Sequence, residues 1–397
     1  MSFRSPWNNP LALWIAYTAA VLVVSAQSLW LRTGKNGYTA YENYVIFRNA
    51  FRHLAQGLNP YAPYPAEQWD LYKYSPAFAV LMAPFHLLPD AVGLVLWNAL
   101  NALPLLWAIL HLPVLDERRR RQIGWFVLLE LLICLQNSQS NGLMAAFILL
   151  TWIALEQGRP TAAAGWAVAG GFLKIFGFFA ALPALLYPRT RPFIGRAALW
   201  ALGLLLLPLL VLSPELLPGV YEAWWALLRT DHEASLGLSV MGWMQAWLGL
   251  GPPKVGVVLV GLAVLLASIW SVRRRRGADG RPPAQERAYL WASVLLWVVL
   301  FNHKAESPTF IIALCGVALW YWSTPHPALW RKILLWSAFA LASLSPSDLV
   351  PPTVRARLVQ PYVLKAVPCI LVWIAISIQL CLPFGAKTKT TLRAHEE

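Results

Sequence analysis

One carboxylate, Glu42, lies in a polar, tyrosine-rich stretch between apolar blocks, within the sequence TAYENYVIFRNAFRHLAQG (39–57). A carboxylate that faces a substrate hydroxyl can remove its proton, so Glu42 is a candidate general base. The residues leave a second explanation open. Thr39 and Glu42 have the spacing of a capping box, in which the glutamate would only satisfy a free backbone N–H at the start of a helix.

A cation in an apolar block is the second candidate. Lys174 lies near the middle of residues 161–187, where a lysine inside a membrane would cost a few kcal/mol. An intramembrane cation that faces a cavity is a natural partner for an anionic phosphate. The alternative is that the side chain snorkels to the membrane surface.

Two short polar segments complete the candidates. FNHKAESPTF (301–310) gathers ionisable groups that could serve a site. Alternatively, Glu306 could pair with Lys304 or with His303 at a helix end. QNSQSNG (136–142) offers amides and hydroxyls to a sugar, or simply joins two helices. A third group, Asp231 and Glu233 around His232, has metal-ligand chemistry, but on a solvated loop it is expected to be a charged surface.

The composition identifies the elements that must position these residues. The chain has 397 residues, of which 58% are hydrophobic and 13% charged, and apolar runs recur from end to end. A soluble protein of this length cannot bury so much apolar surface, so we expect an all-α, polytopic integral membrane protein. The net charge of +14 lies in short clusters between apolar blocks, which is typical of membrane topology and disfavours nucleic-acid binding. The four cysteines stand singly, without metal-ligand or disulfide spacing.

About twelve transmembrane helices are expected. The predicted spans are 11–31, 75–89, 90–113, 123–136, 140–156, 161–187, 197–213, 254–272, 288–301, 307–323, 333–345 and 362–383. The basic clusters place both termini in the cytoplasm, and the large loops 32–74 and 214–253 on the other face. With twelve spans the ERRRR run at 117–121 falls outside and breaks the rule, so the predicted count is eleven to thirteen.

The first external loop contains a predicted amphipathic helix. Phe47, Ala50, Phe51 and Leu54 repeat at helical spacing, with polar residues on the opposite face. Such a helix would lie on the membrane surface, and Gly57 would end it.

The order of these features resembles the GT-C glycosyltransferases, and in particular glycosyltransferase family 87, a polyprenyl-phosphate-mannose-dependent mannosyltransferase-like group. The resemblance rests on the first-loop acid followed by a helix, and on the motifs GLNPY (57–61), YSP (74–76), QSN (139–141), FLK (172–174) and ESP (306–308). The chain departs from the family's usual pattern at three places. Glu42 stands where the family usually has an aspartate, and Ile175 where it usually has a proline after the lysine. In the family a serine-proline run leads into a histidine, whereas here His303 precedes Ser307 and Pro308.

The resemblance implies one GT-C-like domain over residues 1–397 of a multi-pass protein in the bacterial inner membrane. It implies inverting transfer of a mannose-like hexose from a polyprenyl-phosphate donor to a lipid or glycan acceptor on the non-cytoplasmic face, with Glu42 as the base and with no cofactor or metal. The donor phosphate would be bound by Lys174, Lys73, His303 and Lys304. The substrates would be bound by Asn43, Gln139, Asn141, Glu306 and Tyr74.

Two alternative functions stay open from the sequence. A transporter or flippase of lipid-linked saccharides would be expected to show paired internal repeats with broken helices, and we find no such symmetry. An O-antigen polymerase or ligase would be expected to carry a large, arginine-rich external loop. The 214–253 loop holds only Arg229, with Lys254 at its edge.

Overall fold

A computed structural model describes residues 9–31, 37–188, 190–233, 235–277 and 280–382. These residues form helices and loops and contain no strand, which confirms the predicted all-α class. The elements are α1 (Pro10–Leu31), α2 (Glu42–Ala55), α3 (Pro76–Leu81), α4 (Ala83–His86), α5 (Asp90–Leu110), α6 (Glu117–Gln136), α7 (Asn141–Glu156), α8 (Pro160–Leu173), η3 (Ile175–Leu186), α9 (Thr190–Leu206), η4 (Leu207–Leu210), α10 (Leu217–Glu233), α11 (Val240–Leu248), α12 (Lys254–Arg274), α13 (Ala284–Leu300), η5 (Ser307–Thr309), α14 (Phe310–Trp322), α15 (Leu329–Ala338), η6 (Phe339–Leu344), α16 (Pro352–Val354), η7 (Arg355–Val359) and α17 (Val367–Cys381).

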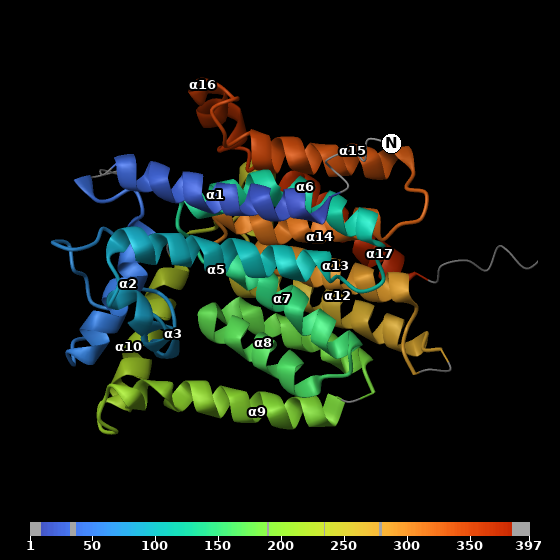
Figure 1. The fold of residues 1–397 in the computed structure, drawn as a ribbon. Coiled ribbons are helices and arrows are strands. Elements are labelled where there is room, and N and C mark those ends of the chain that lie inside the picture. Colours follow the sequence, from blue (N-terminus) through green and yellow to red (C-terminus); the bar gives the residue numbers. More distant parts are fainter. Residues whose placement is uncertain (1–8, 32–36, 189, 234, 278–279, 383–397) are drawn as a thin grey trace, which may run out of the picture.

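Long helices run between two ends of the molecule (Figure 1). The α5–α6 connection, the start of α9 and the end of α12 lie at one end, on the right, whereas α2, α3, α10 and α16 lie at the other. Four helices in the described part of the chain are long and apolar enough to cross a membrane: Pro10–Leu31, Asp90–Leu110, Thr190–Leu210 and Lys254–Arg274. They support the predicted membrane protein. The count of about twelve spans stays a prediction.

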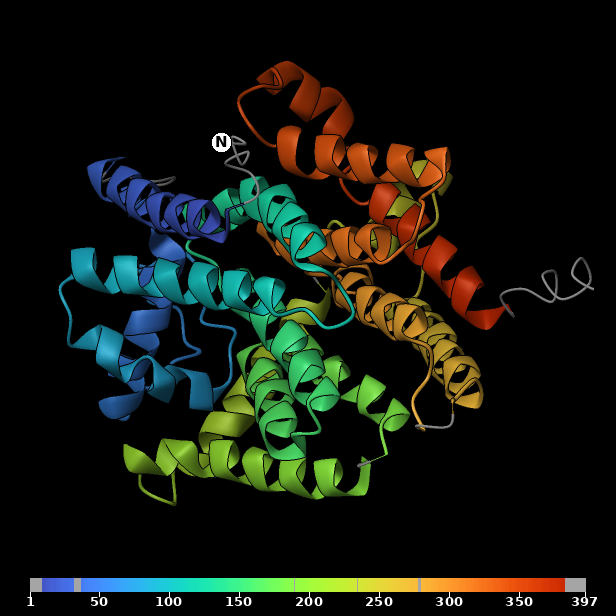
Figure 2. The ribbon, with the colours of Figure 1, turned by 45° about the vertical axis from the view of Figure 1, so that its right-hand side comes forward.

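The centre of the bundle is the pair α13 and α14. Every residue of α13 from Arg287 to Leu300 is buried, as is every residue of α14 from Phe310 to Trp320. Figure 2 shows the two helices lying side by side within the bundle. Outer helices instead expose apolar side chains, such as Leu199 of α9. Apolar exposure on the outer helices suits a lipid environment.

The proline-rich segment 75–89 does not form the predicted span. It divides into α3 of six residues and α4 of four, each far too short to cross a membrane. Ser75 caps α3 by accepting a hydrogen bond from the Phe78 backbone N–H at 3.2 Å, and Pro84 lies in the first turn of α4. The prolines therefore start and interrupt short helices, because each lacks a backbone donor.

The predicted span 161–187 is also wrong, because it is a helical hairpin. The backbone of Lys174 is extended (φ −145°, ψ 128°), and it separates α8 from the 3₁₀ helix η3. The two arms touch: a Cβ at Gly177 would lie 2.3 Å from the Gly170 carbonyl carbon, so only glycine permits this approach. At the open end, Pro160 and Tyr187 line the same small cavity. Lys174 therefore occupies the tip of a hairpin.

The predicted first-loop helix and its end are confirmed. Gly57 has a positive φ of 70°, and the Leu58 N–H bonds the His53 carbonyl at 2.8 Å while the Gly57 N–H bonds that of Leu54 at 3.1 Å. These two bonds form a Schellman motif. The polar face of α2 is covered as well, because the buried His53 ring bonds Glu67 at 2.9 Å. The helix is thus held inside its own loop.

Candidate active site

A cavity of about 1240 Å³ lies where α2, the α6–α7 loop, the hairpin tip, α10 and residues 302–309 meet. Its polar wall carries nine of the ten predicted site residues. A second part of the wall is apolar and aromatic, and it includes Ile175, Phe176, Phe179, Val258, Trp297 and Phe301. A cavity with these two walls can hold a molecule that has both a polar head and a hydrocarbon part.

Glu42 lines this cavity as the first residue of α2. Its carboxylate accepts hydrogen bonds from the Thr39 hydroxyl at 3.0 Å and from the Trp69 backbone N–H at 3.1 Å. The N-cap is Tyr41, and no side chain caps the helix, so the capping box with Glu42 at N3 is wrong. Burial raises the pKa of Glu42 above its ordinary value, although the bonds from Thr39 and Trp69 oppose the rise. A carboxylate with a raised pKa is the stronger proton acceptor.

Lys174 lines the cavity from the hairpin tip, and its charge is held by neutral groups. Its Nζ donates to Asn141 Oδ1 at 2.6 Å and lies 5.5 Å from the ring centre of Tyr74 and 5.9 Å from that of Phe176. Among the residues that the structure describes, no carboxylate forms an ion pair with it. The ammonium is therefore available to an anionic ligand, in contrast to the snorkelling alternative.

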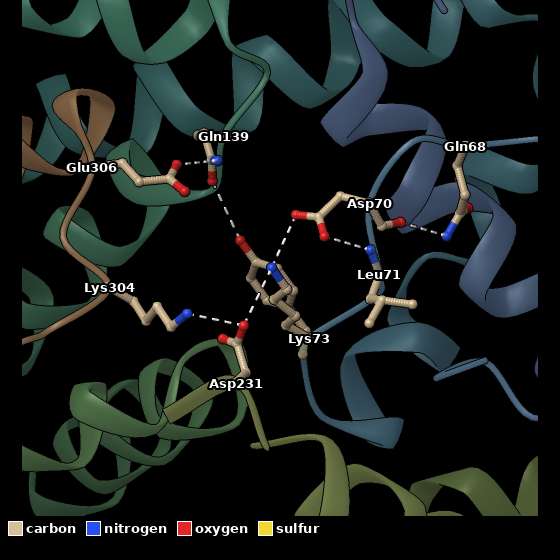
Figure 3. A network of polar contacts seen from close by, with 9 residues as sticks. Gln68, Asp70, Leu71, Lys73, Gln139, Asp231, Lys304 and Glu306 are labelled. Carbon is tan, nitrogen blue, oxygen red and sulfur yellow. Dashed lines mark hydrogen bonds and ion pairs between the residues drawn. The ribbon is translucent and has the colours of Figure 1, made fainter. Parts of the chain in front are cut away.

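The other two lysines are already paired (Figure 3). Lys73 contacts Asp70 at 2.9 Å and Asp231 at 3.7 Å, and Lys304 contacts Asp231 at 3.0 Å. Burial lowers the pKa of Lys73, but Asp70, Asp231 and Glu306 outweigh it, so the pKa lies above its ordinary value. Asp231 thus bridges two cations. The ion pair that the sequence offered between Lys304 and Glu306 is replaced by the pair of Lys304 with Asp231.

Gln139 and Glu306 meet across the polar wall. Gln139 Nε2 lies 3.5 Å from Glu306 Oε2, and the Tyr74 hydroxyl lies 3.4 Å from Gln139 Oε1. The two residues come from the α6–α7 loop and from the segment that leads into α14 (Figure 3). Two of the predicted polar segments therefore form one surface of amide, carboxylate and phenol groups.

Three further predicted residues take different places. Asn43 lines the cavity and donates from Nδ2 to the Asn137 carbonyl at 2.8 Å. His303 lines the cavity as well. Asn141 does not line it but holds Lys174 from behind.

The comparison with protein families agrees with this site. The sequence model of glycosyltransferase family 87 matches residues 72–302, more than half of the chain. The chain belongs to glycosyltransferase family 87. The suspected family is therefore confirmed, and the protein is a glycosyltransferase. A search of curated proteins finds no match.

The family 87 match covers only part of the cavity wall. It includes Lys73, Lys174 and Asp231, whereas Glu42 precedes it and Glu306 follows it. The fold brings these outer residues to the matched ones.

Asp231 is the residue that the sequence reasoning missed. We expected a solvated charged surface, but its side chain is only 19% exposed and makes two ion pairs. The side chains of His232 and Glu233 lie outside the described residues. A signal was present: Trp224, Leu228 and Asp231 are spaced at i, i+4 and i+7, and all three line the cavity. Trp224 also donates from Nε1 to the Lys73 carbonyl at 3.2 Å, which fastens α10 over the site.

Within the described part of the chain, no three His, Cys, Asp or Glu residues lie together so that they could hold a metal ion.

Proposed function

We propose that this family 87 protein transfers a mannose-like hexose, with inversion, from a polyprenyl-phosphate sugar to a hydroxyl of a lipid or glycan acceptor. The observation that carries the proposal is the cavity itself. It joins a buried carboxylate (Glu42), a cation that pairs with no carboxylate among the described residues (Lys174), and an apolar aromatic wall. A lipid-phosphate sugar presents the three matching groups: an acceptor-facing sugar, a phosphate and a hydrocarbon chain.

In this scheme Glu42 takes the proton of the acceptor hydroxyl as its oxygen attacks the anomeric carbon. The new carbon–oxygen bond forms on the face opposite the phosphate, so the configuration inverts. The bond from the anomeric carbon to the phosphate oxygen breaks, and its electron pair goes to the lipid phosphate. Lys174 stabilises this developing charge, with Lys73, His303 and Lys304 around it. The proton ends on Glu42.

Gln139, Glu306, Asn43 and Tyr74 are proposed to hold the sugar and acceptor hydroxyls. The surface that they form mixes donors and acceptors, which suits a molecule rich in hydroxyl groups. Asn141 acts through Lys174 by orienting its ammonium.

The fold also supports an active site on the non-cytoplasmic face. If 75–89 does not cross and 161–187 returns to its starting side, the helix α5 ends inside and the ERRRR run at 117–121 becomes cytoplasmic. The run would then lie on the same side of the membrane as Arg273 and Arg274 at the end of α12, as the positive-inside rule requires. The α5–α6 connection and the end of α12 lie at one end of the bundle (Figure 1). The cavity lies at the other end, with α2 and α10. We propose the bacterial inner membrane as its location.

A donor panel tests the proposal. Membranes that contain the protein are supplied with radiolabelled polyprenyl-phosphate hexoses, polyprenyl-diphosphate sugars and nucleotide sugars, and the labelled product is separated by solvent extraction. We expect label transfer from a polyprenyl-phosphate hexose, which the Glu42→Gln variant abolishes. Transfer from a nucleotide sugar alone would overturn the proposal.

A further inference from the structure

A buried ion pair lies behind the cavity, outside the groups that the proposed mechanism uses. Lys365 Nζ contacts Glu130 Oε1 at 2.8 Å, and the two side chains are 3% and 0% exposed. Lys365 precedes α17 and lies beyond the part of the chain that the family matches. A buried ion pair is seldom a gain in stability over apolar residues of similar volume, so its presence suggests another use.

The same ammonium reaches the cavity wall. Lys365 Nζ donates to Ser307 Oγ at 2.8 Å and lies 5.1 Å from the ring centre of Phe310. Ser307 directly follows Glu306, which faces the cavity, and the Glu306 backbone N–H donates to Thr309 Oγ1 at 3.2 Å. Lys365 thus holds the short helix η5 (Ser307–Thr309) from its buried side, while Glu306 projects from the other.

The carboxylate partner leads to the facing part of the wall. Glu130 belongs to α6, whose last turn is followed by the loop that carries Gln139. Gln139 and Glu306 are the residues that meet across the wall at 3.5 Å. One lysine therefore fastens two elements. Gln139, nine positions after Glu130, faces Glu306, which directly precedes Ser307.

We propose that Lys365 is a positioning residue that sets the separation of Gln139 and Glu306 by binding Glu130 and Ser307 at once. A single ammonium thereby fixes the relative position of two elements that are far apart in the sequence. The effect on sugar transfer rests on the proposed function; the effect on the geometry of the wall does not. Because a misplacement of about 1 Å can cost about a hundredfold in rate, loss of this anchor should slow transfer roughly 10- to 100-fold.

Two variants separate positioning from stability alone. Lys365→Met leaves Glu130 without its partner and should lower the melting temperature. The double variant with Glu130→Gln removes both charges and should restore the melting temperature, because no unpaired charge stays buried. If Lys365 positions the wall, the double variant still transfers slowly, since Ser307 has lost its donor.

Ser307→Ala gives the matched test, because it keeps the ion pair. We expect a melting temperature near that of wild type and a kcat at least about tenfold lower, in the direction of the Lys365 variants. Ser377→Ala is the control: Ser377 is also buried, and its hydroxyl bonds the Trp373 carbonyl at 2.9 Å, away from the cavity. Recovery of full rate in the double variant, or a Ser307→Ala rate equal to that of Ser377→Ala, would overturn the proposal.

A cross-link reads the geometry without any sugar donor. Cysteines replace Gln139 and Glu306 in a Cys381→Ser background, since Cys134, Cys315 and Cys369 are buried. A short thiol-reactive cross-linker should join the pair efficiently when Lys365 is present and several-fold less in Lys365→Met and in the double variant. Equal yields would contradict the positioning role. If no lipid-phosphate sugar is used by wild type, the proposed function fails, while the cross-link still decides this inference.

Discussion

The substitution Glu42→Gln separates a catalytic base from a structural carboxylate. Glutamine has nearly the same size but keeps only one of the two carboxylate oxygens: its Oε1 can accept from the Trp69 N–H, while its Nε2 can donate to the Thr39 hydroxyl, which reverses that bond. Each of these bonds loses a charged acceptor, which weakens it by about 1 kcal/mol. Burial works the other way, because it disfavours the charged carboxylate and raises its pKa. The two effects offset one another, so we expect little change in the melting temperature.

The rate should respond very differently. An amide cannot take the acceptor's proton, and loss of a general base typically costs about 100- to 10,000-fold, or about 2.7–5.5 kcal/mol of transition-state stabilisation. Glu42→Asp should fall between, because it keeps a base on a shorter side chain. In wild type the rate should rise with pH through the pKa of Glu42, which lies above its ordinary value of 4.5. That acid limb should be absent in the glutamine variant.

The assay is the transfer rate of purified variants with a polyprenyl-phosphate sugar, at several pH values and with melting temperatures measured in parallel. Glu67→Gln is the matched control, since Glu67 lies in the same loop and pairs with Arg52 and His53. It should change stability more than rate. A Glu42→Gln variant that keeps more than about a tenth of the wild-type rate would refute the reasoning. The base would then lie elsewhere, with Glu306 the next candidate.

Three other predictions concern charge and sidedness. Lys174→Met should preserve folding and raise the KM for the lipid-linked donor about ten- to a hundredfold, because a charge-assisted contact to phosphate is worth about 1.5–3 kcal/mol. An unchanged KM would show that Lys174 does not bind the donor phosphate. Asp231→Asn should lower the KM for the donor about two- to fivefold, because Asp231 then no longer competes with the phosphate for Lys73 and Lys304. Partly exposed ion pairs of this kind are worth about 0.2–1 kcal/mol each. A higher KM would show that Asp231 helps to hold the donor. Single cysteines at Tyr64 and Arg274 should label from opposite faces of the membrane, and labelling from the same face would overturn the topology.

Local patterns predicted local structure well. The spacing of Phe47 and Leu54 gave the helix α2, and Gly57 gave its end, because both depend on residues within one or two turns. Hydropathy failed at 161–187, since a hairpin and a span have the same apolar composition. The extended backbone of Lys174 and the close contact of Gly170 with Gly177 distinguish them, and neither can be read from polarity.

The candidate site shows the same limit. Glu42, Lys174 and Glu306 stand out because each interrupts an apolar or patterned context, and the structure brings all three to one cavity. Asp231 belongs to α10, in a segment that the sequence predicted to be an external loop, where a carboxylate is common and does not stand out. Its role depends on its ion pairs with Lys73 and Lys304, which the fold brings to it from distant parts of the chain.

The length of the hairpin arms determines how deep Lys174 lies in the membrane. The first arm, α8, has 14 residues and so a length of about 21 Å, against a hydrocarbon core of about 30 Å. If this arm starts at the cytoplasmic surface, as the proposed topology requires, it stops about two-thirds of the way across the hydrocarbon core. A donor phosphate that contacts Lys174 would then lie deeper in the membrane than the headgroups of the neighbouring lipids. The acceptor hydroxyl would have to reach the same depth. Lengthening both arms by one turn would raise this meeting point by about 5.4 Å, so arm length governs how far an acceptor has to extend.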